Sequence, residues 1–106
     1  MTDLEMRFHQ AMIDIYQRAK DECGYNATRF LSMLSARGGL EAARTLLATS
    51  APSSGFTTLW EHGRLDLTVE AHILKPEFAA LFTQDEKELA RSRLEEYGYE
   101  FPTAID

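Results

Sequence analysis

The segment DLEMRFHQAMIDIYQRAKDECG, residues 3–24, decides the fold class of this protein. Residues spaced three and four apart lie on one face of an α-helix, and apolar side chains recur here at that spacing. They are Leu4, Phe8, Ala11, Met12, Ile15, Ala19 and Cys23. Gly24 follows, and glycine readily adopts the left-handed conformation that ends a helix. The segment therefore predicts an amphipathic helix over residues 3–23.

Two more helices are predicted directly after the first. Asn26 is suited to cap a helix over residues 27–36, because its side chain can accept a hydrogen bond from a free amide of the first turn. Gly38 and Gly39 are expected to end that helix, and a third helix is expected over residues 40–48. The side chains expected to face inward are Phe30, Leu31, Leu34, Leu40, Ala43, Leu46 and Leu47.

A loop and a short helix are predicted next. The stretch TSAPSSG, residues 49–55, is small and polar and contains Pro52, so it predicts a loop. Ser54 is expected to cap a helix over residues 55–62, which Gly63 ends. That helix is expected to bury Phe56, Leu59 and Trp60. Residues 64–68 are expected to form an extended connector that places Leu65 and Leu67 in the core.

The last third of the chain predicts further helices. Thr68 is expected to cap one over residues 69–74, and Pro76 favours a short one over residues 77–81. Thr83 and Glu86, three positions apart, form a capping-box pattern for a final helix that reaches Tyr97. Side chains expected to be buried by this helix are Leu89, Ala90, Leu94 and Tyr97. Residues 98–106 are expected to form an extended tail that docks through Tyr99 and Phe101.

These elements together predict an all-α protein, with residues 1–106 forming a single compact domain of five to seven short helices. The chain is 44% hydrophobic and 26% charged, which argues against disorder. No apolar run approaches the roughly 20 residues that cross a bilayer. The first ten residues carry charges of both signs and do not resemble a secretory signal, so we expect a cytoplasmic protein without membrane contact.

The candidate functional residues gather in GFTTLWEHGRLDLTVEAHIL, residues 55–74, which contains the only tryptophan and two of the three histidines. The cluster comprises Trp60, His62, Arg64, Asp66, Glu70 and His72. Four of these are common metal ligands, namely His62, Asp66, Glu70 and His72. However, Glu70 and His72 are two positions apart, about 200° around a helix. The lone Cys23 cannot form a disulfide within the chain and suits a small core or boundary residue. We expect no metal and no cofactor.

The sequence also gives little support to catalysis. It has no GxSxG motif, no Cys/His motif and no glycine-rich phosphate loop. Arg64 is expected to brace the connector by pairing with Asp66 or Glu61, which would keep Asp66 ionised. His62 fits the negative end of a helix, and His72 fits a boundary position. His9 is expected to face solvent.

The sequence bears on two kinds of partner, nucleic acid and protein. The helices before and after Gly38 resemble a helix–turn–helix in spacing, and Arg29, Arg37 and Arg44 could face DNA. However, the chain has a net charge of −6 and its would-be recognition helix carries only Arg44 among bases, so nucleic acid is not expected. Aromatic and arginine side chains are typical anchors of protein interfaces. The expected partner is therefore another protein, or a second copy of this chain.

The chain also resembles a family of small bacterial proteins of uncharacterised function. The resemblance runs from about Phe8 to Tyr99, and GFTxLWExGRLDLTVE is its most specific part. It implies a bacterial, stand-alone, soluble domain and transfers no catalytic role to any residue. We therefore expect a non-catalytic protein-interaction or regulatory module. The alternative is a small enzyme or nucleic-acid-associated protein that uses the region from Trp60 to His72.

Overall fold

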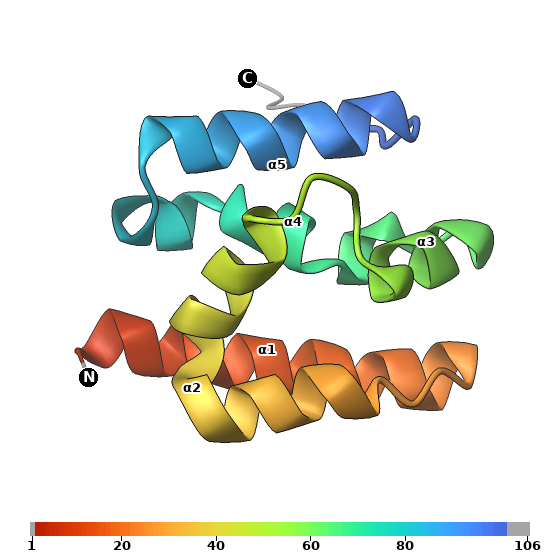
Figure 1. Ribbon diagram of the computed structural model, residues 1–106, viewed down its shortest axis with the longest axis horizontal. Coiled ribbons are helices and arrows are strands. Elements are labelled where there is room, and N and C mark those ends of the chain that lie inside the picture. The colour runs from red at the N-terminus through yellow and green to blue at the C-terminus, as the bar shows by residue number, and fades with distance from the viewer. Residues whose placement is uncertain (1, 102–106) are drawn as a thin grey trace.

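The structure, a computed structural model, describes residues 2–101 and confirms the all-α fold. Its elements are α1 (Asp3–Cys23), α2 (Thr28–Leu47), α3 (Ser54–Glu61), η1 (Leu65–Leu67), α4 (Val69–Ile73), η2 (Pro76–Leu81) and α5 (Gln84–Glu96), where η marks a 3-10 helix. Figure 1 shows three tiers: α1 with the first half of α2, then α3 and α4, then α5. The longest helix, α1, has 21 residues, as its apolar stripe predicts, and α2 spans 20 residues across a kink at Gly38.

Helix α1 has the limits that the sequence predicts. Thr2 and Glu5 form a capping box at its start, and Gly24 ends it in the left-handed conformation with φ 67°. Phe8 and Met12 are completely buried, as the apolar stripe indicates. Asn26, in contrast, does not cap the next helix. Its side-chain oxygen instead accepts a hydrogen bond from the Tyr16 hydroxyl at 2.6 Å, and α2 begins without a side-chain cap.

Helix α2 joins the two helices expected before and after the glycine pair. Gly38 has φ 82° and ψ 164°, and this non-helical residue separates two helical parts of α2 by a kink, as the glycine pair predicts. The first half runs beside α1 and the second half turns away from it (Figure 1). A Cβ atom on Gly39 would lie 2.7 Å from the Cα of His9, so this crossing requires glycine. The Gly39 amide donates to His9 Nδ1 at 2.9 Å, so the expectation that His9 faces solvent is wrong.

The connection between α2 and α5 is more helical than expected. Ser53, one residue before the expected Ser54, caps α3 by accepting a hydrogen bond from the Phe56 amide at 3.2 Å. The expected extended connector is the 3-10 helix η1, although its Leu65 and Leu67 are buried as predicted. The Thr68 cap of α4 and the Thr83 capping box of α5 are confirmed.

The core lies between the tiers. Phe8 of α1 packs edge-to-face against Phe78 and Phe82, with ring centroids 5.1 and 5.3 Å away. A second cluster joins Phe56, Leu65 and Leu94, and half-buried side chains that pack against it include Tyr97, Tyr99 and Phe101. The predicted docking of Tyr99 and Phe101 is therefore confirmed, while residues 102–106 of the expected tail lie outside the described residues.

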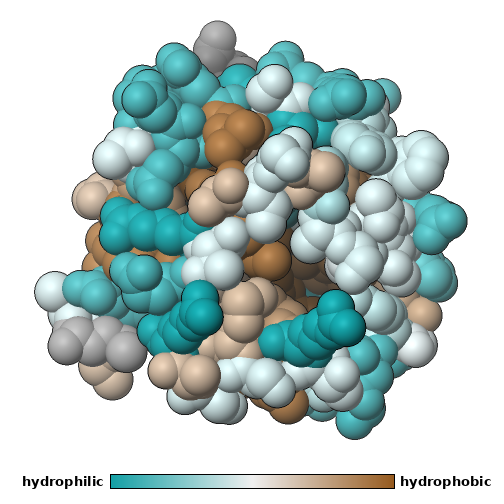
Figure 2. Space-filling model, viewed as in Figure 1, coloured by the Kyte–Doolittle hydropathy of each residue, from teal (hydrophilic) through white to brown (hydrophobic). Residues whose placement is uncertain are grey.

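Three apolar side chains expected inside are instead exposed. Leu31 is 37% exposed, Leu89 is 40% exposed and Trp60 is 47% exposed. Each lies beside the buried stripe of its helix, because the neighbouring helices cover a narrower face than the apolar pattern suggests. Figure 2 shows one face of the molecule, where hydrophobic side chains appear in patches between hydrophilic ones. None of the described helices has the length and hydropathy needed to cross a bilayer.

Candidate functional site

The six candidate residues between Trp60 and His72 do not converge on one site. Asp66 lines two neighbouring grooves, one together with Trp60 and the other together with His72. Glu70 is buried in the interior and lines a separate, small cavity. The two others, His62 and Arg64, are absent from the walls of these three hollows. The structure therefore divides the cluster among two grooves, the core and surface positions outside the grooves.

Arg64 is the centre of an ion-pair network. Its guanidinium donates to both carboxylate oxygens of Asp66, at 3.0 and 3.1 Å, as expected. Its second partner is Glu22 of α1, at 2.6 Å, and the alternative partner Glu61 is not used. Glu22 also pairs with Arg18 at 2.8 Å. The network thus joins the end of α1 to the connector between α3 and α4.

The network keeps both carboxylates charged. Hydrogen bonds from Arg18 and then from Arg64 lower the pKa of Glu22 to about 2. The hydrogen bonds from Arg64 likewise lower the pKa of Asp66 below its ordinary value. A general base at neutral pH needs a pKa closer to 7. The geometry of Arg64 and Asp66 is therefore that of a structural brace.

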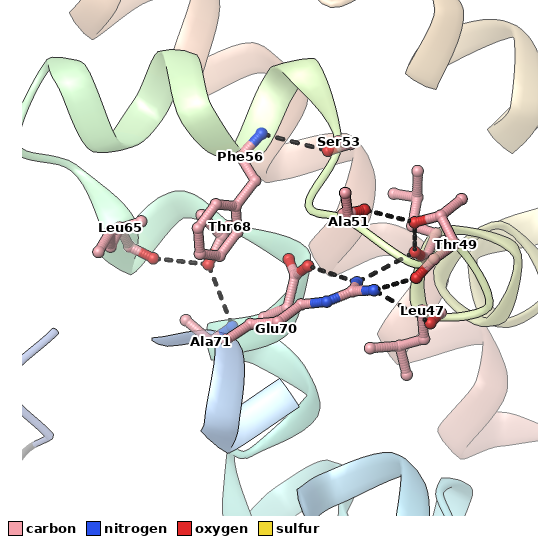
Figure 3. Close-up of polar contacts among 11 residues, drawn as sticks. Leu47, Thr49, Ala51, Ser53, Phe56, Leu65, Thr68, Glu70 and Ala71 are labelled. Carbon is pink, nitrogen blue, oxygen red and sulfur yellow. Dashed lines mark hydrogen bonds and ion pairs between the residues drawn. The ribbon is translucent and has the colours of Figure 1, made fainter. Parts of the chain in front are cut away.

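Glu70 lies in the core beside Arg93 of α5. Its carboxylate is 3.4 Å from Arg93 Nη1, and each of the two residues is 5% exposed or less. The same guanidinium donates to the carbonyls of Leu46 at 3.1 Å, Leu47 at 3.3 Å and Thr49, all at the end of α2. Figure 3 shows Glu70 beside this fan of hydrogen bonds. Burial raises the pKa of Glu70, because the shared guanidinium offsets only part of the cost of an interior charge.

The two histidines of the cluster bond to the backbone of their own helices. His72 is 6% exposed, and its Nδ1 lies 2.9 Å from the carbonyl of Thr68. Burial lowers the pKa of His72, and the nearby cations Lys75 and Arg18 act in the same direction. His62 is exposed at the end of α3, with its Nδ1 2.9 Å from the carbonyl of Thr58. His72 thus contributes a largely buried, neutral ring to the wall of its groove.

The first groove has three aromatic side chains in its walls and is called the aromatic groove. Its walls include Trp60, Leu65, Asp66, Tyr97, Tyr99 and Glu100, and its volume is about 370 Å³. The rings of Trp60 and Tyr97 meet edge-to-face, 5.3 Å between centroids. Tyr97 in turn meets the buried Phe56 at 5.0 Å, so the exposed Trp60 rests on a rigid aromatic base.

The second groove carries positive side chains and is called the cationic groove here. Its walls include Arg18, Asp66, His72, Lys75, Arg91 and Tyr99, and its volume is about 470 Å³. The guanidinium of Arg91 lies over the Phe101 ring, 4.7 Å from its centroid. Asp66 and Tyr99 line both grooves, so the two grooves adjoin.

The third hollow is small, about 50 Å³, and lies beside Glu70 between α1, α2 and α3. Its walls are mostly apolar, including Ile15, Phe30 and Leu59. A water molecule needs roughly 10–15 Å³ of such space, so a cavity of this size holds at most a few waters. It is much smaller than the roughly 300 Å³ at which ligand pockets begin. The two surface grooves are therefore the better candidates for binding.

Several groove residues were not among the sequence candidates. Arg18, Lys75, Arg91 and Tyr99 come from α1, the α4–η2 junction, α5 and the segment after α5. Only Tyr99 gave a signal in the sequence, as an aromatic residue expected to dock. The three cations are surrounded by ordinary helical sequence, so nothing local marks them. Within residues 2–101, His, Cys, Asp and Glu side chains form no group of three that could hold a metal ion.

Comparison with protein-family models, with curated proteins and with solved structures gives no match for this chain. The resemblance of GFTxLWExGRLDLTVE to small bacterial proteins stays a prediction. Function is therefore inferred from the geometry of the two adjoining grooves.

Proposed function

We propose that this protein is a non-catalytic helical module that binds another protein through the adjoining aromatic and cationic grooves. The observation that carries the proposal is the half-exposed Trp60, which rests on Tyr97 at the edge of the aromatic groove. Tryptophan, tyrosine and arginine dominate the binding energy of protein interfaces because they bury large areas with few rotamers to immobilise. A cytoplasmic site of action in a bacterium is part of the same proposal.

The dimensions of the surface suit a short peptide segment. The grooves have volumes of about 370 and 470 Å³, and pockets of roughly 300–1,000 Å³ take groups of side-chain size and larger. Tyr99 separates them as a shared wall, so an extended segment crossing this residue could place side chains in both. Tyr99 is itself held in place by the hydrogen bond from its amide to the Leu94 carbonyl, at 2.9 Å.

The enzymatic alternative has less support from the geometry. It needs Arg64, Asp66, Glu70 and His72 to share one accessible cleft, but Glu70 is buried in the core and pairs there with Arg93.

A role in binding nucleic acid also has less support from the geometry than protein binding has. Arg44, the one base on the would-be recognition helix, is held by Glu86 at 3.1 Å and by the Leu81 carbonyl at 3.0 Å. It is therefore used to join α2 to the α5 region.

The proposal can be tested with Trp60 as its own reporter. Proteins captured from host cells by the immobilised chain are identified, purified and titrated back while the fluorescence of this single tryptophan is recorded. A partner that binds the aromatic groove shifts the Trp60 emission, because the ring leaves water. Trp60→Ala is expected to weaken binding by about tenfold or more, as hot-spot residues do.

Leu89→Ala provides the matched control. Leu89 is a large apolar side chain of similar exposure on α5, and it lines neither groove. It is expected to leave the affinity unchanged. Equal loss with both variants, or none with Trp60→Ala, would show that the partner binds elsewhere. Sedimentation analysis extends the test to self-association: a dimer that Trp60→Ala disrupts would identify a second copy as the partner.

A further inference from the structure

The cationic groove has a charge opposite to that of the whole protein. The chain has a net charge of −6, yet Arg18, Lys75 and Arg91 line this groove against one acid, Asp66. Asp66 is already neutralised by the two hydrogen bonds from Arg64. Glu22, the other nearby acid, is shared between Arg18 and Arg64. Counting Arg64 with the three lining cations, four cations therefore face two carboxylates, Asp66 and Glu22.

Two of the cations have no carboxylate partner within residues 2–101. Lys75 and Arg91 are exposed and form no ion pair with another described residue. The backbone of Lys75 is fixed, because its amide donates to the His72 carbonyl at 3.2 Å and Pro76 follows. Arg91 is stacked on Phe101, which leaves the N–H groups at the edge of its guanidinium free to donate. Both cations are thus positioned for an incoming anion.

We infer that the cationic groove is a carboxylate-binding subsite that takes the acidic side chains of a partner's peptide segment. This inference rests on the proposed function and adds the chemistry of the partner. Lys75 and Arg91 supply the charge that attracts the carboxylates, while Tyr99 and Phe101 supply an apolar wall for the methylene groups of a glutamate. The adjoining aromatic groove then takes an apolar residue of the same segment.

An acidic peptide fits this surface better than nucleic acid does. Three cations line the cationic groove, and the chain around Tyr99 carries acids, including Glu100 in the aromatic groove and Glu95 and Glu96 at the end of α5. A nucleic acid backbone repeats its charge along its whole length and needs an extended basic surface. A peptide can instead place one or two carboxylates in the groove and apolar side chains beside it.

The test uses hexaglutamate with blocked ends, titrated into the full-length, isotopically labelled protein and followed by NMR. Blocked hexaglutamine is the matched peptide without charge. Hexaglutamate is expected to shift the amide signals of His72, Lys75 and Arg91, and added salt should reverse the shifts because it screens the charges. Shifts of equal size with hexaglutamine, or no shifts with either peptide, would overturn the inference.

Variants identify the groups responsible. Lys75→Gln and Arg91→Gln are each expected to weaken hexaglutamate binding by about two- to fivefold, the range for exposed charge pairs. Lys20→Gln is the control, because it removes the same charge from α1 at an exposed position outside both grooves. Circular dichroism checks that all three variants fold. Equal weakening by Lys20→Gln, or tighter binding of a DNA duplex than of hexaglutamate, would contradict the inference.

The same variants separate this inference from the proposed function. A captured partner that loses affinity with Trp60→Ala but not with Lys75→Gln or Arg91→Gln would leave the interaction module standing and remove the carboxylate subsite. A loss of partner affinity with all three variants supports both the interaction module and the carboxylate subsite. Unchanged affinity with all three variants removes both proposals.

Discussion

Arg93 of α5 lies 3.4 Å from the carboxylate of Glu70 of α4, and both side chains are buried. The same guanidinium donates to three carbonyls at the end of α2. The last carbonyls of a helix have no partner within it, and inside a protein they need a donor. Arg93 supplies that donor and also neutralises Glu70. One side chain therefore ties α2, α4 and α5 together.

The first prediction follows from this double role. Arg93→Met is expected to lower the free energy of unfolding by about 3–5 kcal/mol, because it leaves the buried Glu70 without its ion-pair partner and the Leu47 and Thr49 carbonyls without their side-chain donor. Glu70→Gln should cost about 1 kcal/mol or less, since it removes a carboxylate whose charge is already disfavoured by burial and leaves the carbonyl contacts in place. Urea unfolding followed by circular dichroism measures both. If the two variants lost the same free energy of unfolding, the ion pair with Glu70, and not the hydrogen bonds to the end of α2, would account for the contribution of Arg93.

The second prediction concerns the crossing of α1 and α2. Gly39→Ala is expected to destabilise the protein by about 1–3 kcal/mol, because the new methyl group meets the His9 backbone and forces the helices apart. Gly55→Ala is the control, since its Cβ would meet no atom closer than 3.4 Å and alanine favours helix. The midpoint of thermal unfolding should fall for the first variant and stay level or rise for the second.

The third prediction concerns the network around Glu22. Its pKa of about 2 depends first on Arg18 and then on Arg64, so Arg18→Gln and Arg64→Gln should each raise it toward the ordinary 4.5. Because the folded-state pKa is depressed, the stability that Glu22 contributes is present above pH 4.5 and lost as the pH falls toward 2. NMR titration of the Glu22 carboxyl measures the shift. An unchanged pKa in both variants would contradict the assigned contacts.

The fourth prediction concerns His72. Burial lowers its pKa below the ordinary 6.5, so folding favours the neutral ring. The stability that this ring contributes is present above pH 6.5 and is lost as the pH falls through 6.5 toward the folded-state pKa. His72→Asn keeps a donor near the position of Nδ1 but cannot titrate. Its free energy of unfolding should therefore decline less than that of the wild type between pH 7.5 and 5.5. If the free energy of unfolding fell equally with pH in the variant and the wild type, a group other than His72 would be responsible for the decline.

The candidate site was only partly predictable. The pairing of Arg64 with Asp66 was predicted because the two residues are close in sequence, but Glu22 lies 42 positions away and was missed. The cationic groove was missed because its charged residues come from separate elements and each is an ordinary surface residue in its own helix. Trp60 was expected inside, since hydropathy alone does not show that no neighbouring helix covers it.

The sequence by itself determined the helix content and most helix ends of this protein. Capping residues and apolar stripes act between positions three or four apart, so the limits of α1 and the caps at Thr68 and Thr83 can be derived from local spacing. Only the tertiary structure decided the partners of His9, Glu22 and Glu70, which lie 30, 42 and 23 positions away. These depend on how the helices cross. A periodic pattern specifies which face of a helix is buried and leaves open which helix covers it.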